Sequence, residues 1–201
     1  MSGLAVKAES ERLYTYADYL EWDDDKRYEL IDGRVYMMSA PTSNHQDVCR
    51  EISRVISNYL VGKRCKLYFA PFDVRLTPKP FGKDDTVVQP DIVVICDPKK
   101  IDRRGCVGAP DLVIEITSPS TSARDKLLKF NKYLWAGVRE YWIVDPRDKT
   151  VSVHLLNENR YVTNVYGKDD TVPVATLEGC EVNLKDVFPQ DRHATLKLKR
   201  G

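Results

Sequence analysis

The chain has 201 residues, enough for one domain with a sizeable core but too few for two comfortable ones. Its composition of 42% hydrophobic and 30% charged residues excludes a disordered chain and a membrane-embedded one. The formal net charge of +1 excludes a strong overall basic field, so any contact with nucleic acid needs a local basic patch.

The five cysteines are scattered and form no CxxC motif. This pattern disfavours a zinc knuckle and a disulfide framework, and it predicts a reducing, cytoplasmic setting. No apolar run is long enough for a signal sequence or a membrane span, so we expect neither export nor a membrane anchor. We expect one domain over 14–189, with an N-terminal tail at 1–13 and a C-terminal tail at 190–201.

The N-terminal part predicts two helices and a hairpin. A short helix is expected over 15–22, with Thr15 as its cap. Asp32-Gly33 lies between two strand-like runs and predicts a tight hairpin turn, because both residue types tolerate positive φ. Apolar residues at the helical period then predict a long helix that Ser43 caps.

Three apolar runs follow, and they predict central strands of one sheet. The runs cover 66–76, 87–96 and 110–117 and are rich in Val, Ile, Leu and aromatic residues. The segments between them, 77–86 and 97–108, are rich in Pro, Gly and charge. We expect both of these segments to be exposed, mobile loops.

The C-terminal part predicts one more helix and several strands. The helix is expected over 123–137, with Ser120 or Thr121 as its cap and Gly137 as its stop. A core strand with an exposed end is expected over 140–146, followed by antiparallel strands over 150–184. The order predicts an α/β fold, in which one central mixed sheet is flanked by helices and carries a small antiparallel β extension.

Two acidic residues interrupt the apolar strands. Asp91 opens one apolar run and Glu115 falls inside the next, where an unpaired carboxylate would cost roughly several kcal/mol. Mg²⁺ is a natural partner, because hard cations take carboxylate oxygens and reduce the repulsion between two nearby acids. Two other interpretations stay open: Asp91 could begin its strand at the surface, and Glu115 could form a structural ion pair.

A polar stripe marks the helix that follows. Asp125, Lys129 and Tyr133 recur every four residues and therefore share one helical face. Taken alone, this spacing is typical of a solvated lysine or of an ion pair between Lys129 and Asp125.

Several motifs together resemble the Uma-two family of putative restriction endonucleases, a branch of the PD-(D/E)XK nuclease superfamily. The motifs are YELIDGRVYMMSAP with a histidine four residues later, QPDIVV, DLVIEITSPST, the stripe just described, and AGVREYWIVDP. The resemblance covers about residues 14 to 189. It implies a restriction-endonuclease-like core, with Asp91 and Glu115 as metal-binding acids and Glu29 as a further acid of the pocket.

The sequence departs from the parent superfamily at one position. Thr117 stands two residues after Glu115, where the superfamily usually has a lysine. The Uma-two branch lacks that lysine too, and Lys129 matches its migrated replacement. The resemblance also places His45 at the pocket as a proton shuttle or phosphate contact, with a locally hydrogen-bonded helix residue as the alternative.

These expectations combine into a Mg²⁺-dependent nuclease, with Mn²⁺ as a substitute, that acts on DNA as a homodimer. Asp91, Glu115 and the carbonyl of Ile116 would be the metal ligands, and Lys129 would orient water or stabilise phosphate charge. One competing interpretation is a non-catalytic DNA-binding or interaction module, which the neutral overall charge favours. Another is a hydrolase of a small phosphorylated or glycosidic substrate that uses Asp91 and Glu115 as an acid/base pair.

Overall fold

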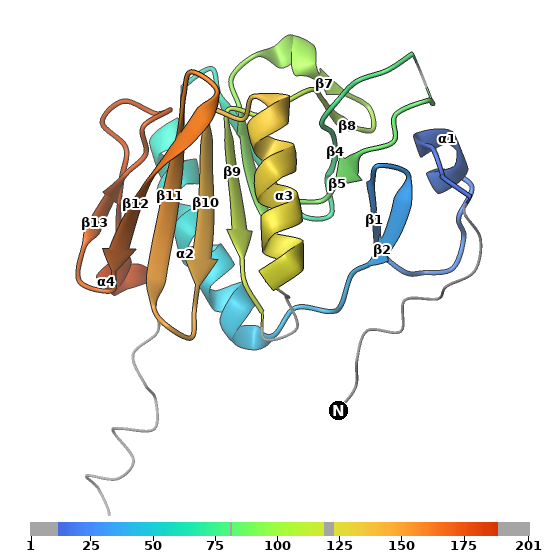
Figure 1. Cartoon of the computed structure of the whole chain (residues 1–201). Helices are drawn as coiled ribbons and strands as arrows, with labels where there is room; N and C mark the ends of the chain where they lie inside the picture. The colour runs from blue at the N-terminus through green and yellow to red at the C-terminus, as the bar shows by residue number, and fades with distance from the viewer. Residues whose placement is uncertain (1–11, 81, 119–122, 189–201) are drawn as a thin grey trace, which may run out of the picture.

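The structure is a computed structural model, and it describes residues 12–80, 82–118 and 123–188, without the side chains of 123–125. It contains two six-stranded mixed sheets and a two-stranded antiparallel sheet. The expected α/β class and the small antiparallel pair are therefore confirmed. The expectation of one central sheet is wrong, because a second sheet of six short strands lies beside the first (Figure 1).

The first sheet, here called the main sheet, has the strand order β12 (Arg160–Gly167), β11 (Thr150–Asn157), β10 (Glu140–Asp145), β9 (Leu112–Ile116), β6 (Ile92–Ile95) and β3 (Lys66–Phe69). The second, here called the side sheet, has the order β2 (Arg34–Met37), β1 (Tyr28–Ile31), β5 (Val87–Val88), β4 (Asp73–Arg75), β8 (Gly105–Val107) and β7 (Ile101–Asp102). The small sheet pairs β13 (Thr171–Pro173) with β14 (Glu181–Asn183). Only β9–β10 and β4–β8 are parallel pairs among these strands.

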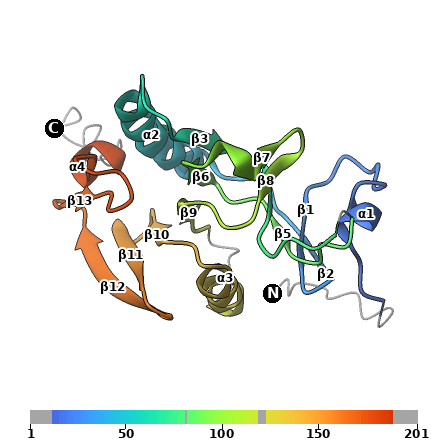
Figure 2. The same cartoon turned by 90° about the horizontal axis from the view of Figure 1, so that it is seen from above.

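The helices are α1 (Tyr16–Tyr19), α2 (Ser43–Leu60), α3 (Ala123–Ala136) and α4 (Leu184–Val187), with a 3-10 turn η1 at Pro98–Lys100. Figure 2 shows α2 and α3 on opposite faces of the main sheet. In the part of the chain that is described, no helix has both the length and the apolar character needed to cross a bilayer.

Two of the expected strands are each broken into a pair that belongs to different sheets. The first run gives β3 and β4, which are separated by a cis Ala70–Pro71 peptide. The second gives β5 and β6, which are separated at Pro90. Proline has no N–H to donate to a ladder, so a continuous strand ends there. The two points at which the chain passes from one sheet to the other lie side by side, because the Ala70 N–H donates to the Asp91 carbonyl at 3.2 Å.

Alternating residues of the main sheet form two cores. Ile114 and Ile116 of β9 pack with Ile52 and Ile56 of α2, whereas Val113 packs on the side of α3. This follows from the strand period of two, since successive side chains point to opposite faces. Each fully buried aliphatic side chain stabilises the fold by about 1.5–3 kcal/mol. Glu115 therefore faces α3, the side opposite to its two isoleucine neighbours.

The helix ends show which local predictions hold. Thr15 does cap α1, but that helix ends at Tyr19, so the expected range was too long. The cap of α2 is Thr42 and not Ser43: Thr42 has extended backbone angles and its hydroxyl accepts from the His45 N–H at 3.3 Å. Gly137, at φ 83°, follows the end of α3 as expected. The expected cap of α3, Ser120 or Thr121, lies outside the described residues.

The predicted hairpin turn is confirmed. Asp32 and Gly33 have φ of 52° and 72°, which matches a tight turn between β1 and β2. A Cβ at Gly33 would lie 2.9 Å from the Cβ of Leu13, so both the backbone angle and the packing require glycine.

Both segments that we expected to be exposed loops are partly buried. In 77–86, Asp84 is buried, and its carbonyl accepts from the Tyr16 N–H at 2.7 Å because α1 docks on this segment. In 97–108, the chain forms η1, β7 and β8, and Cys106 is fully buried. Their polar composition concealed tertiary partners that lie far away in the sequence.

The 140–146 strand is a core strand as expected: Glu140, which begins it, is fully buried, and Asp145 at its other end is partly exposed. The expectation for the cysteines is corrected. The structure pairs Cys65 with Cys96, 31 residues apart, beside the β3–β6 ladder that brings their neighbours into register. The scattered cysteine pattern gave no hint of this disulfide, because strand pairing decides which residues meet. The other cysteines are free.

Candidate active site

Two acids meet where β6 begins and β9 ends. The two strands are antiparallel, with Ile92 opposite Ile114, so the residue before Ile92 lies next to the residue after Ile114. These residues are Asp91 and Glu115. The Ile116 N–H donates to Oδ2 of Asp91 at 2.7 Å and holds this carboxylate against the end of β9. Strand pairing thus brings together the two acids that the sequence singled out.

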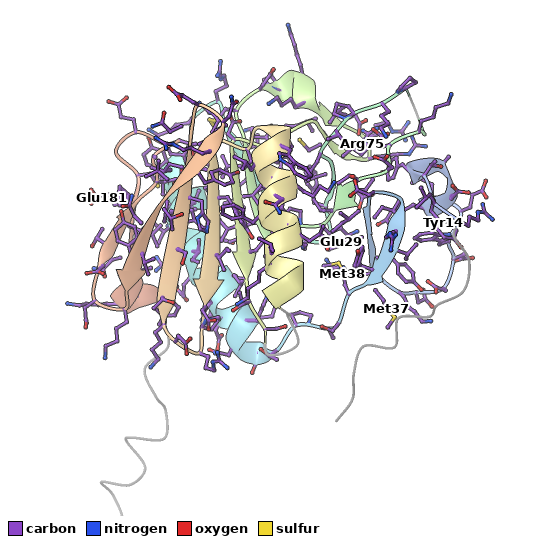
Figure 3. The ribbon with its side chains drawn as sticks, in the orientation of Figure 1. Tyr14, Glu29, Met37, Met38, Arg75 and Glu181 are labelled. Atoms are coloured by element: carbon purple, nitrogen blue, oxygen red, sulfur yellow. A yellow bond between two sulfur atoms is a disulfide. The ribbon has the colours of Figure 1, made fainter. Side chains whose placement is uncertain are left out.

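A third acid reaches the same place from the side sheet. Glu29 lies on β1 and is buried, on the side of the hairpin that faces α3 (Figure 3). Its Oε1 accepts from the main-chain N–H of Gln89 at 2.8 Å. The side sheet, which the sequence did not predict, is therefore what delivers Glu29 to the acids of the main sheet.

Lys129 lies between the acids. From α3, its Nζ donates to Oε1 of Glu29 at 2.8 Å and to Oε1 of Glu115 at 3.0 Å. Its side chain is only 17% exposed, so the interpretation as a solvated lysine does not hold. Burial lowers the pKa of Lys129, but the charges of Glu115 and Glu29 outweigh that effect and the pKa lies above its ordinary value. The side chain of Asp125, the other proposed partner, lies outside the described residues.

Tyr133 is a site residue to which the sequence assigned no role. It lies one turn after Lys129 and is fully buried, and its hydroxyl donates to Oε1 of Glu115 at 2.6 Å. Burial, followed by the charge of Glu115, raises the pKa of Tyr133 well above its ordinary value, so the hydroxyl stays protonated and keeps donating. The spacing of four residues from Lys129 was the available signal.

His45 holds Asp91 from the other side. It lies in the first turn of α2, is buried, and its Nε2 is 3.1 Å from Oδ2 of Asp91. Burial lowers the pKa of His45, but the hydrogen bond and charge of Asp91 outweigh this, and the net shift is upward. The imidazole thus contacts a site acid directly through its ring, and its ring Nδ1 has no hydrogen-bond partner among the described residues.

The crowding of acids changes the protonation of Glu115. Burial raises its pKa, Lys129 opposes the shift, and the charges of Asp91 and Glu29 raise the pKa further, to about 7. Near neutral pH this carboxyl group therefore takes up a proton readily. A cation beside it would lower this pKa again, because it stabilises the charged carboxylate.

The three carboxylates share one pattern of hydrogen bonding. One oxygen of each accepts twice: Oε1 of Glu29, Oδ2 of Asp91 and Oε1 of Glu115. Within the described ranges, the second oxygen of each accepts no hydrogen bond. Each carboxylate is thus oriented through one oxygen, and its second oxygen can bind a ligand.

This donor set suits a hard divalent cation. Such cations take carboxylate and carbonyl oxygens, and Mg²⁺ needs only one or two carboxylates because it keeps several waters. In the described residues, no three His, Cys, Asp or Glu side chains are grouped so that they could hold a metal. The ligand set expected from sequence contains only two such side chains, Asp91 and Glu115, with a main-chain carbonyl as its third member.

Gln89 is the second residue whose role the sequence missed. Its main chain binds Glu29, while its side chain accepts from Arg27 Nε at 2.9 Å and donates to Tyr19 and Asp73, each at 2.9 Å. Its only sequence signal was its place in the QPDIVV motif. Every residue except proline has a main-chain N–H, so the type of residue at position 89 does not reveal this role.

The acids at the ends of β6 and β9, with the buried Lys129 beside them, form an arrangement that can hold a divalent cation and stabilise charge on a phosphate ester. Residues 16–185 match the model of the Uma2 family, which is described as "Putative restriction endonuclease". The chain belongs to this family.

The chain is also similar to two known proteins. An uncharacterized protein of Synechocystis sp. is 26% identical over 145 residues, which is 71% of this chain and 74% of that protein. The crystal structure of a putative nuclease belonging to DUF820, from Anabaena variabilis, is similar with a TM-score of 0.70 at 23% identity. The similarity covers 87% of this chain and 97% of the other, and at that identity it establishes the shared fold.

Proposed function

We propose that this protein is a Mg²⁺-dependent nuclease that hydrolyses phosphodiester bonds of DNA. The proposal rests on two carboxylates, Asp91 and Glu115, next to the buried ammonium of Lys129. Among the described residues, each carboxylate is hydrogen-bonded through one oxygen only, and we call these two residues the half-held acids. Membership of a family described as restriction endonucleases supports DNA as the substrate.

The residues divide into a metal-holding set and a charge-stabilising set. Asp91, Glu115 and the carbonyl of Ile116 would hold Mg²⁺, or Mn²⁺ in its place. When bound, the cation polarises the scissile phosphate and lowers the pKa of a coordinated water. Lys129 directs a fixed positive charge to the same place, where it stabilises negative charge on the phosphate or orients the attacking water.

The remaining residues position these groups. Glu29 anchors Lys129 through a 2.8 Å contact, so we assign it to the lysine and not to a second metal. Tyr133 fixes the rotamer of Glu115, and His45 fixes Asp91. Partners of this kind are what keep ligating groups oriented in metal sites.

Cleavage assays on plasmid and branched DNA test the proposal. Wild type is incubated with Mg²⁺ or Mn²⁺ beside Asp91→Ala, Lys129→Ala and Lys132→Ala. Lys132 is the matched control, since it lies on the same helix and pairs with exposed Asp32 instead of with the acid site. We expect cleavage by wild type and Lys132→Ala only.

The outcomes separate the candidate functions. No cleavage by wild type, or equal cleavage by all four proteins, contradicts the nuclease. DNA binding without cleavage would support the non-catalytic module. Metal-independent hydrolysis that survives Lys129→Ala would support an acid/base pair of Asp91 and Glu115 acting on a small substrate.

We also propose that the protein acts as a homodimer, which suits the cutting of two strands. The edge strand β12 supports this. One side of β12 pairs with β11 and the other side pairs with no described strand, and the side chains of Val162 and Val165 are exposed. The mass in solution, measured by light scattering over a range of concentrations, should be that of two chains. A single-chain mass throughout contradicts the dimer.

A further inference from the structure

A cavity of about 540 Å³ lies next to the acid site and is not part of it. It is bordered by the edge strand β3, by the start of β4 and by the turn between β7 and β8. Figure 2 shows the β7–β8 hairpin on the same side of the molecule as β3 and β6. A volume of this order is typical of pockets that hold small organic groups.

One wall of the cavity is a flat pair of aromatic rings. Tyr68 and Phe72 stack with ring centroids 4.3 Å apart and an interplanar angle of 7°, and both side chains are half-buried. In such a stacked pair, the ring face that does not cover its partner offers a π-surface to a planar ligand. Base stacking on aromatic side chains is the recurring means by which proteins bind unpaired nucleotides.

The floor of the cavity is polar and rigidly held. Asp73 accepts from the hydroxyl of Tyr16 at 2.9 Å, from the hydroxyl of Tyr19 at 3.2 Å and from the amide of Gln89 at 2.9 Å. A carboxylate has about four acceptor sites, so one acceptor site of Asp73 is left for a ligand donor. Ring N–H and exocyclic amino groups of a nucleobase are donors of this kind.

The rim of the cavity carries two arginines, beside Asp102, whose carboxylate pairs with Arg75. Arg103 and Arg104 occupy the turn between β7 and β8, line the cavity and are exposed. An arginine presents planar donors that match phosphate geometry. Because the chain has a formal net charge of only +1, adjacent arginines at a cavity rim are the sort of local patch that nucleic-acid binding requires.

The cavity is tied to the acid site through one residue. Gln89 donates from its main chain to Glu29 and from its side chain to Asp73. The loop at Ala70 that carries Phe72 also donates to the carbonyl of Asp91. If a nucleotide of the DNA occupied the cavity, the same DNA strand would run close to Asp91, Glu115 and Lys129.

We propose that this cavity is a subsite for one unpaired nucleotide of the DNA substrate. The base packs on Tyr68 and Phe72 and donates to Asp73, and the adjacent phosphate binds Arg103 and Arg104. The proposal rests on the DNA substrate proposed above and specifies it: the protein engages DNA that carries a single-stranded or flipped-out nucleotide.

Binding is measured by fluorescence anisotropy, with a short labelled single-stranded DNA oligonucleotide and an abasic analogue of the same length. EDTA is present, so binding is scored without any cleavage. The test variant is Phe72→Leu, which keeps apolar volume and removes the flat ring. The matched control is Phe69→Leu, because Phe69 follows Tyr68 on β3 and so points to the opposite face, with 59% of its surface exposed.

Wild type should bind the base-containing strand about tenfold more tightly than the abasic strand, the preference that stacking of one base supplies. Phe72→Leu should bring this ratio close to one, and Phe69→Leu should preserve it. Thermal unfolding of both variants checks that they are folded, and Tyr68→Phe, which keeps a flat ring, should retain the preference.

The arginines are tested by salt dependence. Arg103→Ala should reduce the slope of log affinity against log salt by about one, whereas Arg54→Ala should leave it unchanged. Arg54 is the matched control because it is exposed on α2 and does not line the cavity. Equal slopes for the two variants contradict the assignment of the rim.

An unchanged ratio in Phe72→Leu, no preference in wild type, or no binding by wild type overturns the subsite. These outcomes are independent of the nuclease proposal, because Glu115→Gln should abolish cleavage and still bind the oligonucleotide with the wild-type preference. Cleavage with no base preference would leave the nuclease standing without the subsite.

Discussion

Two glutamates on adjacent parallel strands make the instructive comparison in this molecule. Glu140 begins β10 and Glu115 lies near the end of β9. Both oxygens of Glu140 are occupied: Oε1 accepts from the indole of Trp142 at 2.8 Å and the Ala175 N–H at 3.1 Å, and Oε2 from the Thr176 N–H at 2.7 Å. Among the described residues, Glu115 is held only through Oε1, by Lys129 and Tyr133.

Glu140 is fully buried and the side chain of Glu115 is 16% exposed, but the two residues differ most in their hydrogen-bond partners. Neutral donors on both oxygens make Glu140 a structural anchor, which ties the segment before β14 to the main sheet. Glu115 instead has other charges around it and one oxygen that accepts nothing within the described residues. A buried acid is thus a candidate for function when its hydrogen bonding is incomplete.

The largest expected effect is on cleavage. Glu115→Gln should lower the rate by about a thousandfold, because it removes a charge on which both the cation and Lys129 depend. Glu140→Gln should leave the rate per folded molecule within about threefold of wild type, since the residue only anchors a segment. The cleavage rates are measured on plasmid DNA with Mg²⁺. A comparable loss of rate in the two variants would contradict the assignment of Glu115 to the site and of Glu140 to the scaffold.

Stability should show the reverse order. Glu140→Gln places an amide where three donors converge and should lower the free energy of unfolding by about 2 kcal/mol. Urea denaturation at pH 8 measures this, with Glu115→Gln as the matched variant on the neighbouring strand. Glu115→Gln should cost less, because it removes repulsion from Asp91 and Glu29. A larger loss in Glu115→Gln would contradict the assignment of roles.

His45 should affect metal affinity by a smaller factor. His45→Ala removes the ring that orients Asp91 and should weaken Mg²⁺ binding about tenfold. His45→Gln retains a donor at a similar reach and should recover part of the loss. If the His45→Ala and His45→Gln proteins bind Mg²⁺ with equal affinity, the hydrogen bond from residue 45 does not position the carboxylate of Asp91.

The smallest expected effect is a pH dependence of stability. The pKa of Glu115 is raised from 4.5 to about 7, so its contribution to stability is present at low pH and is lost as pH rises through about 7. Between pH 5 and pH 8 in EDTA, wild type should lose about 1 kcal/mol or more relative to Glu115→Gln. A difference between the two proteins that does not change with pH speaks against the raised pKa.

Local signals in the sequence were enough for some parts of the fold. The period of the apolar residues located α2 and α3, and the turn chemistry of Asp32-Gly33 located the hairpin. Acids that interrupt apolar runs pointed to Asp91 and Glu115, which antiparallel pairing of their strands then brings together. These features depend on residues close to one another in the chain.

Features that depend on distant partners could not be predicted from local residue patterns. Glu29 and Lys129 were expected at the pocket only from the family resemblance, because they lie 100 residues apart and the side sheet that carries Glu29 is built from strands of two to four residues with little periodicity of their own. The Cys65–Cys96 disulfide depends on the β3–β6 pairing, and the burial of Glu140 depends on main-chain donors far along the chain. Residue type alone does not show these contacts.

Calorimetric titration of Mg²⁺ into wild type, Glu140→Gln and Glu115→Gln is the most direct test of the central claim that the half-held acids form a cation site. We expect a saturable heat for wild type and Glu140→Gln, stronger at pH 8 than at pH 6 because the proton on Glu115 competes with the cation. Glu115→Gln should show none. The same heat in all three proteins, or no heat in wild type, would contradict the claim.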